Sequence, residues 1–66
     1  MHLSINGQSK EYSLPLTIVQ LLHQLELTPA RVVVELNREI LTADKLADTE
    51  LKDGDTLELI QFVGGG

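Results

Sequence analysis

Hydrophobic and polar residues alternate along the first part of the chain. Leu3 and Ile5 lie between polar neighbours, which is the period of a half-buried strand. The dipeptide Asn6-Gly7 follows, and it is a strong hairpin signal because a type I′ turn needs positive φ at both central positions. We therefore expect a first strand before this turn and a returning strand over Gln8–Leu14.

The pattern then changes to the period of a helix. Thr17 is placed to cap the first turn, and Gln20 three residues later completes a capping box. Apolar residues recur at the i, i+3, i+4, i+7 spacing of one buried stripe, at Ile18, Leu21, Leu22 and Leu25. Pro29 cannot continue a helix, so we expect this one to end by Leu27 or Thr28.

The second half of the chain has the pattern of strands joined by turns. β-branched residues favour a strand after the helix, and a glycine able to take positive φ marks a turn before the last strand. The expected elements are a strand at Arg31–Leu36, a turn at Asn37-Arg38, a short strand at Glu39–Leu41, one helical turn at 43–46 capped by Thr42, a turn at Asp53-Gly54-Asp55 and a last strand at Thr56–Val63.

The order strand, strand, helix, strand, short strand, strand limits the architecture. One helix of about three turns cannot shield two sheets, so it must lie across one face of a single mixed sheet. This predicts an α+β fold, a ubiquitin-like β-grasp with a mixed sheet packed on one main helix. The chain of 66 residues allows one domain. We expect that domain at residues 1–63 and a flexible glycine tail at 64–66.

The last strand presents two different faces. Leu57 and Leu59 must face the helix to complete the core, which places Glu58, Ile60 and Phe62 on the opposite face. A single helix leaves that opposite face uncovered, and two large apolar side chains there predict a docking patch for protein partners. The alternative is that a small domain simply leaves some apolar atoms exposed.

Composition excludes several classes of function. Ten acidic and five basic side chains give a net charge of −5, and the chain has no Trp, one Phe and one Tyr. Nucleic-acid binding is therefore not expected, since it needs a basic surface with stacking aromatic residues. The apolar runs are too short for a membrane span, and the first residues lack the pattern of a signal peptide, so we expect a cytoplasmic protein.

The candidate metal ligands do not form a recognisable set. His2 and His23 are far apart in the sequence, and the acidic residues near Asp53 lack the spacing of a calcium-binding loop. There is no cysteine to provide a thiolate ligand, a nucleophile or a persulfide. We expect no metal site, and we expect the acidic residues to serve turns and solvation.

Three of the five glycines, Gly64, Gly65 and Gly66, stand at the end of the sequence, directly after the most strand-like segment. Without Cβ atoms such a tail has a small cross-section, and it can thread a narrow channel to present a carboxylate. A free α-carboxylate is ionised at neutral pH and is a poor electrophile. The chain has no phosphate-binding G-x-x-x-x-G-K-[ST] loop, so an ATP site for activating this carboxylate must belong to another protein.

The element order, the run Leu51–Leu59 and the terminal diglycine together resemble the sulfur carrier proteins of thiamine biosynthesis, over the whole chain. One departure is the third glycine, Gly64, where the family usually has a larger residue. The resemblance implies that a ubiquitin-activating-like adenylyltransferase uses ATP to adenylate Gly66. A sulfurtransferase step then gives a thiocarboxylate, and thiazole synthase takes the sulfur. Gly64 and Gly65 would be the tail that reaches these partners, while the chain itself binds no cofactor and catalyses nothing.

Other functions share this fold and tail. The small subunit of molybdopterin synthase is the nearest alternative, although the tight connector Thr28-Pro29-Ala30 favours the thiazole carrier. A ubiquitin-like modifier would instead form an isopeptide bond with a lysine. An interaction domain with an inert glycine end is the third possibility.

Overall fold

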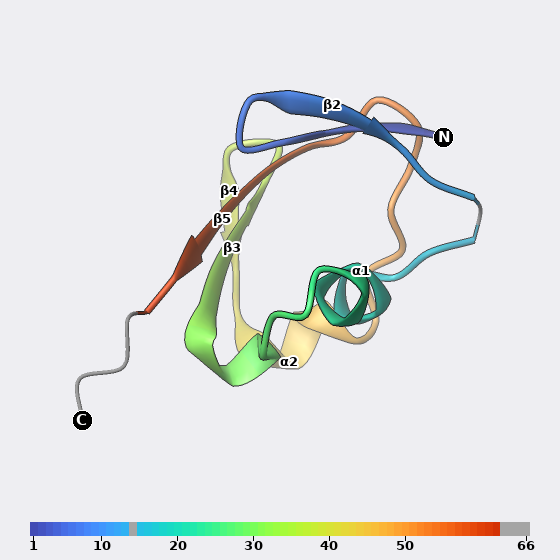
Figure 1. Cartoon of the computed structure of the whole chain (residues 1–66). Helices are drawn as coiled ribbons and strands as arrows, with labels where there is room; N and C mark the ends of the chain where they lie inside the picture. Colours follow the sequence, from blue (N-terminus) through green and yellow to red (C-terminus); the bar gives the residue numbers. More distant parts are fainter. Residues whose placement is uncertain (14, 63–66) are drawn as a thin grey trace.

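The computed structural model describes residues 1–13 and 15–62. Its elements follow the predicted order (Figure 1). They are β1 (His2–Ile5), β2 (Gln8–Glu11), α1 (Ile18–Gln24), the 3-10 turn η1 (Pro29–Arg31), β3 (Val32–Leu36), β4 (Glu39–Leu41), α2 (Ala43–Leu46) and β5 (Thr56–Gln61).

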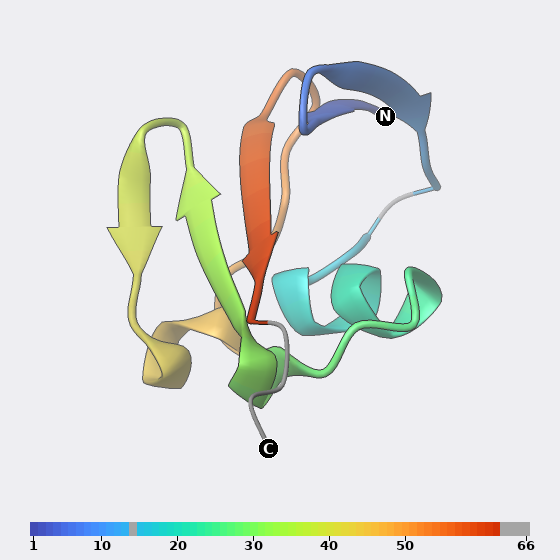
Figure 2. The same ribbon diagram turned by 60° about the vertical axis from the view of Figure 1, so that its left-hand side comes forward.

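The five strands form one mixed sheet in the order β2-β1-β5-β3-β4. β1 and β5 are parallel, and the other neighbouring pairs are antiparallel. The sheet is curved, and α1 and α2 both lie on its concave side (Figures 1 and 2). The arrangement is the mixed sheet with one main helix that the sequence predicts.

The core lies between this concave face and α1. Eleven hydrophobic residues are buried, and no polar or charged residue is buried among the residues described. The three central strands, β1, β5 and β3, send alternate residues inward, which is the period expected of a sheet with one covered face. The buried set is Leu3, Ile5, Leu16, Ile18, Leu21, Leu22, Val32, Val34, Leu46, Leu51 and Leu57.

The start of α1 confirms the predicted capping box. The Gln20 backbone N–H donates to the Thr17 hydroxyl at 3.2 Å, and the Thr17 N–H donates to the Gln20 side-chain oxygen at 2.8 Å. These two bonds satisfy donors that a helix start would otherwise leave open.

α1 ends at Gln24, within the predicted limit of Leu27 or Thr28. The predicted cause was wrong, because a left-handed residue and not Pro29 ends the helix. Glu26 takes a left-handed conformation with φ of 61°. Its N–H bonds to the His23 carbonyl, and the Leu27 N–H bonds to the Leu22 carbonyl at 2.8 Å. This pair of bonds is a Schellman motif, which closes a helix but usually has glycine in the left-handed position.

Three predicted strands are shorter than expected. β2 ends at Glu11, where the register brings the next residue, Tyr12, opposite Met1; Leu14 lies outside the described residues. β3 starts at Val32 because Arg31 belongs to η1. β5 ends at Gln61, although the Phe62 N–H still bonds to the Arg31 carbonyl; Val63 lies outside the described residues.

The segment between β4 and β5 passes beside the start of α1. Thr42 occupies the N-cap position of the single turn of α2, but its side chain makes no capping hydrogen bond, so the predicted cap was wrong in that respect. Hydrogen bonds from the Thr42 side chain and from the backbone N–H of Asp44 instead lower the pKa of the Asp44 carboxyl. Further on, the Leu51 N–H bonds to the Leu16 carbonyl and the Ile18 N–H bonds to the Thr49 carbonyl. The chain is thereby tied to the start of α1 before it enters β5.

We predict that Glu26→Gly stabilises the domain. Glycine takes positive φ without the Cβ clash that Glu26 carries, so the free energy of unfolding should rise by about 0.5–1 kcal/mol even after the added freedom of the unfolded chain. Urea denaturation measures this change. Glu26→Ala is the matched control, because it removes the same charge but keeps the Cβ. An equal gain in both variants would show that charge, and not backbone conformation, is the cause.

Candidate functional site

β5 is the strand that leads to the glycine end, and it lies in the middle of the sheet. Leu57 is fully buried and Leu59 packs partly against the core, whereas Glu58 is exposed. The predicted division of this strand into an inner and an outer face is therefore confirmed.

The outer face carries large apolar side chains in the open. Ile60 is 58% exposed and Phe62 is 57% exposed. Ile40 on β4, which the sequence analysis did not single out, is 65% exposed. The register pairs Ile40 with Glu35 and Glu35 with Glu58, so Ile40 shares a face with Glu58 and, through the strand period, with Ile60. We call Ile40, Ile60 and Phe62 the outer apolar patch.

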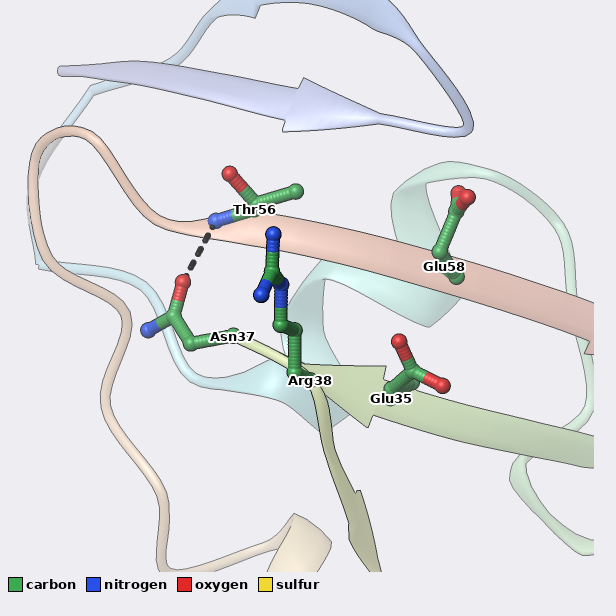
Figure 3. A pocket seen from close by; sticks show the side chains of 5 residues that line it. All are labelled: Glu35, Asn37, Arg38, Thr56 and Glu58. Carbon is green, nitrogen blue, oxygen red and sulfur yellow. Dashed lines mark hydrogen bonds between the residues drawn. The ribbon is translucent and has the colours of Figure 1, made fainter.

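Two carboxylates lie within the same face. Glu35 on β3 is directly opposite Glu58 on β5. Both line a groove of about 410 Å³ with Asn37, Arg38 and Thr56 (Figure 3). Among these five residues the only hydrogen bond drawn joins the Thr56 N–H to the Asn37 side-chain oxygen, at 2.9 Å.

Two asparagines hold β5 from its two sides. Asn6 accepts a hydrogen bond from the Leu59 N–H at 2.8 Å and donates to the Leu59 carbonyl at 3.4 Å. Asn37 holds the start of the strand, because it accepts a hydrogen bond from the Thr56 N–H and donates one to an Asp55 carboxylate oxygen at 3.0 Å. Both asparagines open turns in the left-handed conformation, with φ of 51° and 49°.

The turn before β5 is closed by its acidic residues, as expected from the sequence. The Asp53 carboxylate accepts from the His2 N–H, and the Asp55 carboxylate accepts from the Lys52 N–H, each at 2.7 Å. Gly54 has φ of 89°, which confirms its predicted role in the turn. The Gly54 N–H also bonds to the His2 carbonyl, so the turn is fixed to the beginning of β1.

The predicted reactive end, Gly64, Gly65 and Gly66, lies outside the described residues, and so does the boundary predicted at 63 and 64. The structure places the predicted docking residues Glu58, Ile60 and Phe62 together on one uncovered face. Within residues 1–13 and 15–62, no group of three or more His, Asp or Glu side chains could hold a metal ion. In the same residues, no helix is long and apolar enough to cross a membrane.

Sequence reasoning missed Glu35, Ile40 and the two asparagine clamps. The first two depend on the register between strands, which the alternation within a single strand does not fix. A partial signal existed for the asparagines, because both stand first in a two-residue turn where positive φ is needed. Nothing in the sequence indicates that their amides bond to β5.

Known proteins resemble this chain both in its fold and in a sequence match that includes the three glycines. A sequence model described as the ThiS family matches residues 3–66. The chain belongs to the ThiS family.

Relatives of this ThiS-family chain include full-length sulfur carriers. It is 37% identical to the sulfur carrier protein ThiS of Bacillus subtilis, covering 97% of this chain and 98% of that protein. A crystal structure of a thiamine biosynthesis protein (ThiS) from Geobacter metallireducens matches with a TM-score of 0.83 and 38% identity, covering 100% of both chains. The predicted resemblance and the ubiquitin-like β-grasp fold are both confirmed.

A second kind of relative is much longer. The chain is 39% identical over 66 residues to a protein of Paramagnetospirillum magneticum named thiazole synthase, and it spans only 20% of that protein's length. A region similar to this chain therefore makes up a small part of that longer protein.

We predict that Asn6→Asp destabilises this ThiS-family domain by about 1 kcal/mol, because a carboxylate can still accept from the Leu59 N–H but cannot donate to the Leu59 carbonyl. Chemical denaturation measures the change. Gln8→Glu is the matched control, since it makes the same amide-to-carboxylate change in the same hairpin. Equal losses in the two variants would mean that added charge, and not the lost donor, weakens the fold.

Proposed function

We propose that this chain is a sulfur carrier of thiamine biosynthesis whose reactive group is the carboxylate of Gly66. The observation that supports this most is the reach of the family match, which extends from residue 3 through the three glycines to residue 66. Full-length similarity to proteins named sulfur carrier protein ThiS, from Bacillus subtilis and Escherichia coli, points to the same function.

The chemistry follows from the carboxylate. An oxygen of ionised Gly66 attacks the α-phosphorus of ATP and pyrophosphate leaves, which gives an acyl adenylate. The outer sulfur of a persulfide on a sulfurtransferase then attacks the carbonyl carbon and AMP leaves, which gives an acyl disulfide. A thiol of a partner protein attacks the sulfurtransferase sulfur of this disulfide, so that a new disulfide forms on the partners and the thiocarboxylate leaves. The resulting thiocarboxylate keeps sulfur on the terminal acyl carbon, so the carrier needs no cysteine of its own. Adenylation is required because a free carboxylate resists attack by nucleophiles.

The catalytic groups in this proposal belong to partners. A ubiquitin-activating-like adenylyltransferase binds the ATP, and this chain acts as a protein-borne cosubstrate. Similarity to a segment of proteins named thiazole synthase supports a thiazole synthase as the acceptor of the sulfur. The cytoplasmic location expected from the sequence stays a prediction.

The outer apolar patch gives these partners a place to dock. Ile60 and Phe62 lie just before the glycines, and Glu58 precedes them on the same face. Large exposed apolar side chains on one uncovered sheet face are typical of protein interaction sites. A partner bound there would hold the domain while the chain end enters its active site.

We predict that deleting Gly65 and Gly66 abolishes adenylation and sulfur loading, because it removes the reactive carboxylate. The unfolding transition should stay within about 0.5 kcal/mol of wild type, since the sheet and core are built by residues 1–62. The assay measures formation of the acyl adenylate on the protein by its cognate activating enzyme. Intact-mass measurement then follows sulfur loading.

In the wild type, sulfur loading should raise the intact mass by replacement of one oxygen by sulfur. A covalent ladder on lysines of other proteins would instead select a ubiquitin-like modifier. Loading with sulfur but delivery to molybdopterin would select the alternative carrier function. Adenylation of the truncated protein would overturn the assignment of Gly66.

We predict that Ile60→Ser or Phe62→Ser lowers affinity for the activating enzyme by roughly tenfold or more, since apolar anchors at an interface contribute most of its binding energy. The unfolding free energy should fall by less than about 1 kcal/mol, because both side chains are exposed. Calorimetric titration and urea denaturation give the two quantities. Gln61→Ser, at the exposed position between them, is the control. If the affinity of the variants equals that of wild type while their unfolding free energy falls by more than about 1 kcal/mol, these side chains stabilise the fold and the docking assignment is wrong.

A further inference from the structure

Glu35 and Glu58 are paired in a way that disfavours the sheet. The register between β3 and β5 sets the two side chains directly opposite each other on one face. Like charges in this relation repel and destabilise a sheet. The nearby cation Arg38 lines the same groove, but no interaction joins it to either carboxylate among the residues drawn in Figure 3.

The surface is hollowed on both sides of this carboxylate pair. One groove runs from the pair toward Arg38 and Thr56, and a second depression, also of about 410 Å³, is lined by the pair together with Asn6 and Ile60. A side chain from another molecule can therefore approach both carboxylates from the open side of the sheet.

The pair is bordered by the outer apolar patch. Ile40 is the cross-strand neighbour of Glu35, and Ile60 is two residues after Glu58 on the same face. An acidic centre with apolar side chains beside it is complementary to a basic side chain set in an apolar surface. The net charge of −5 also favours approach of a basic partner.

We infer that Glu35 and Glu58 together bind a basic side chain of the activating enzyme, an arginine, within the interface formed by the outer apolar patch. This rests on the proposed function and specifies the partner surface that it requires. Arginine fits best because its planar guanidinium carries five N–H donors, which can reach two carboxylates at once. Docking would then relieve the repulsion that the free domain carries between its two strands.

The experiment compares charge-neutralising variants in binding to the cognate activating enzyme at low and high salt. Glu35→Gln and Glu58→Gln should each weaken binding by about five- to tenfold at low salt, with a smaller difference at high salt. Their thermal unfolding midpoints should be equal to or higher than that of wild type, because the repulsion is removed. A purely structural role would lower the midpoint instead.

Glu39→Gln is the matched control. Glu39 pairs with Leu36 on β3, which places it on the other face of the sheet, yet it is exposed and carries the same charge. Its affinity should stay within about twofold of wild type, as expected for a charge outside the interface. Glu58→Asp, which keeps the charge, should retain more binding than Glu58→Gln.

Two failures are distinguishable. If wild type is adenylated and both glutamine variants bind as tightly as wild type at low salt, the arginine site is wrong and the proposed function stands. A loss equal in Glu39→Gln and the two variants would also overturn it, because only net charge would then matter. If wild type is neither bound nor adenylated by the activating enzyme, the proposed function fails and this inference fails with it.

Discussion

β5 is held from both sides, by parallel pairing to β1 and by antiparallel pairing to β3. The parallel contact with β1 is short, covering only Ser4 with Thr56 and Ile5 with Leu57. Beyond it, the Asn6 side chain continues the ladder by bonding to both backbone groups of Leu59. This clamp at Leu59, with Asn37 at the start of the strand, fixes the position of β5 between its neighbours. The outer-face residues of the candidate site depend on that position, because the register of β5 decides what stands beside them.

The buried hydrophobic residues of the described chain form one core, which covers one face of the sheet. The eleven buried side chains of the described residues make up this single core cluster. The helices lie on the concave side of the sheet, so the core is on that side. The opposite face consequently has no element of the described chain above it, and its side chains meet whatever approaches from outside. Because one core uses only one face of the sheet, the other face is available for interaction. β5, the strand that leads to the glycines, forms part of that free face.

The small size of the domain also bears on which steps it can perform and which its partners must perform. The two grooves beside Glu35 and Glu58 are lined by side chains of neighbouring strands, and neither of them encloses a chamber for ATP or a thiazole precursor. In the proposed function the domain supplies recognition and a chain end that carries sulfur, while partners supply catalysis. The charged and apolar residues of the outer face then decide which partner the end is delivered to.

The sequence alone determined the features that depend on near neighbours in the chain. The Asn6-Gly7 turn, the Thr17 and Gln20 capping box and the inner and outer faces of β5 were all predictable, because each follows from the geometry of a few consecutive residues. The fold also followed from the sequence, through the order of its elements, and the family followed from that order together with the run Leu51–Leu59 and the glycines after the last strand.

The tertiary structure alone decided which distant residues meet. The opposition of Glu35 to Glu58 is set by strand register, and a shift by one residue would separate the pair to opposite faces. The Asn6 clamp on Leu59 likewise needs β1 and β5 to be parallel neighbours. The end of α1 at Gln24 depends on the left-handed conformation of Glu26, which local propensity disfavours, and it is stabilised because Leu22 and Leu27 pack into the shared core. Local patterns cannot fix these contacts, since their free energy comes from burial and pairing across the whole domain.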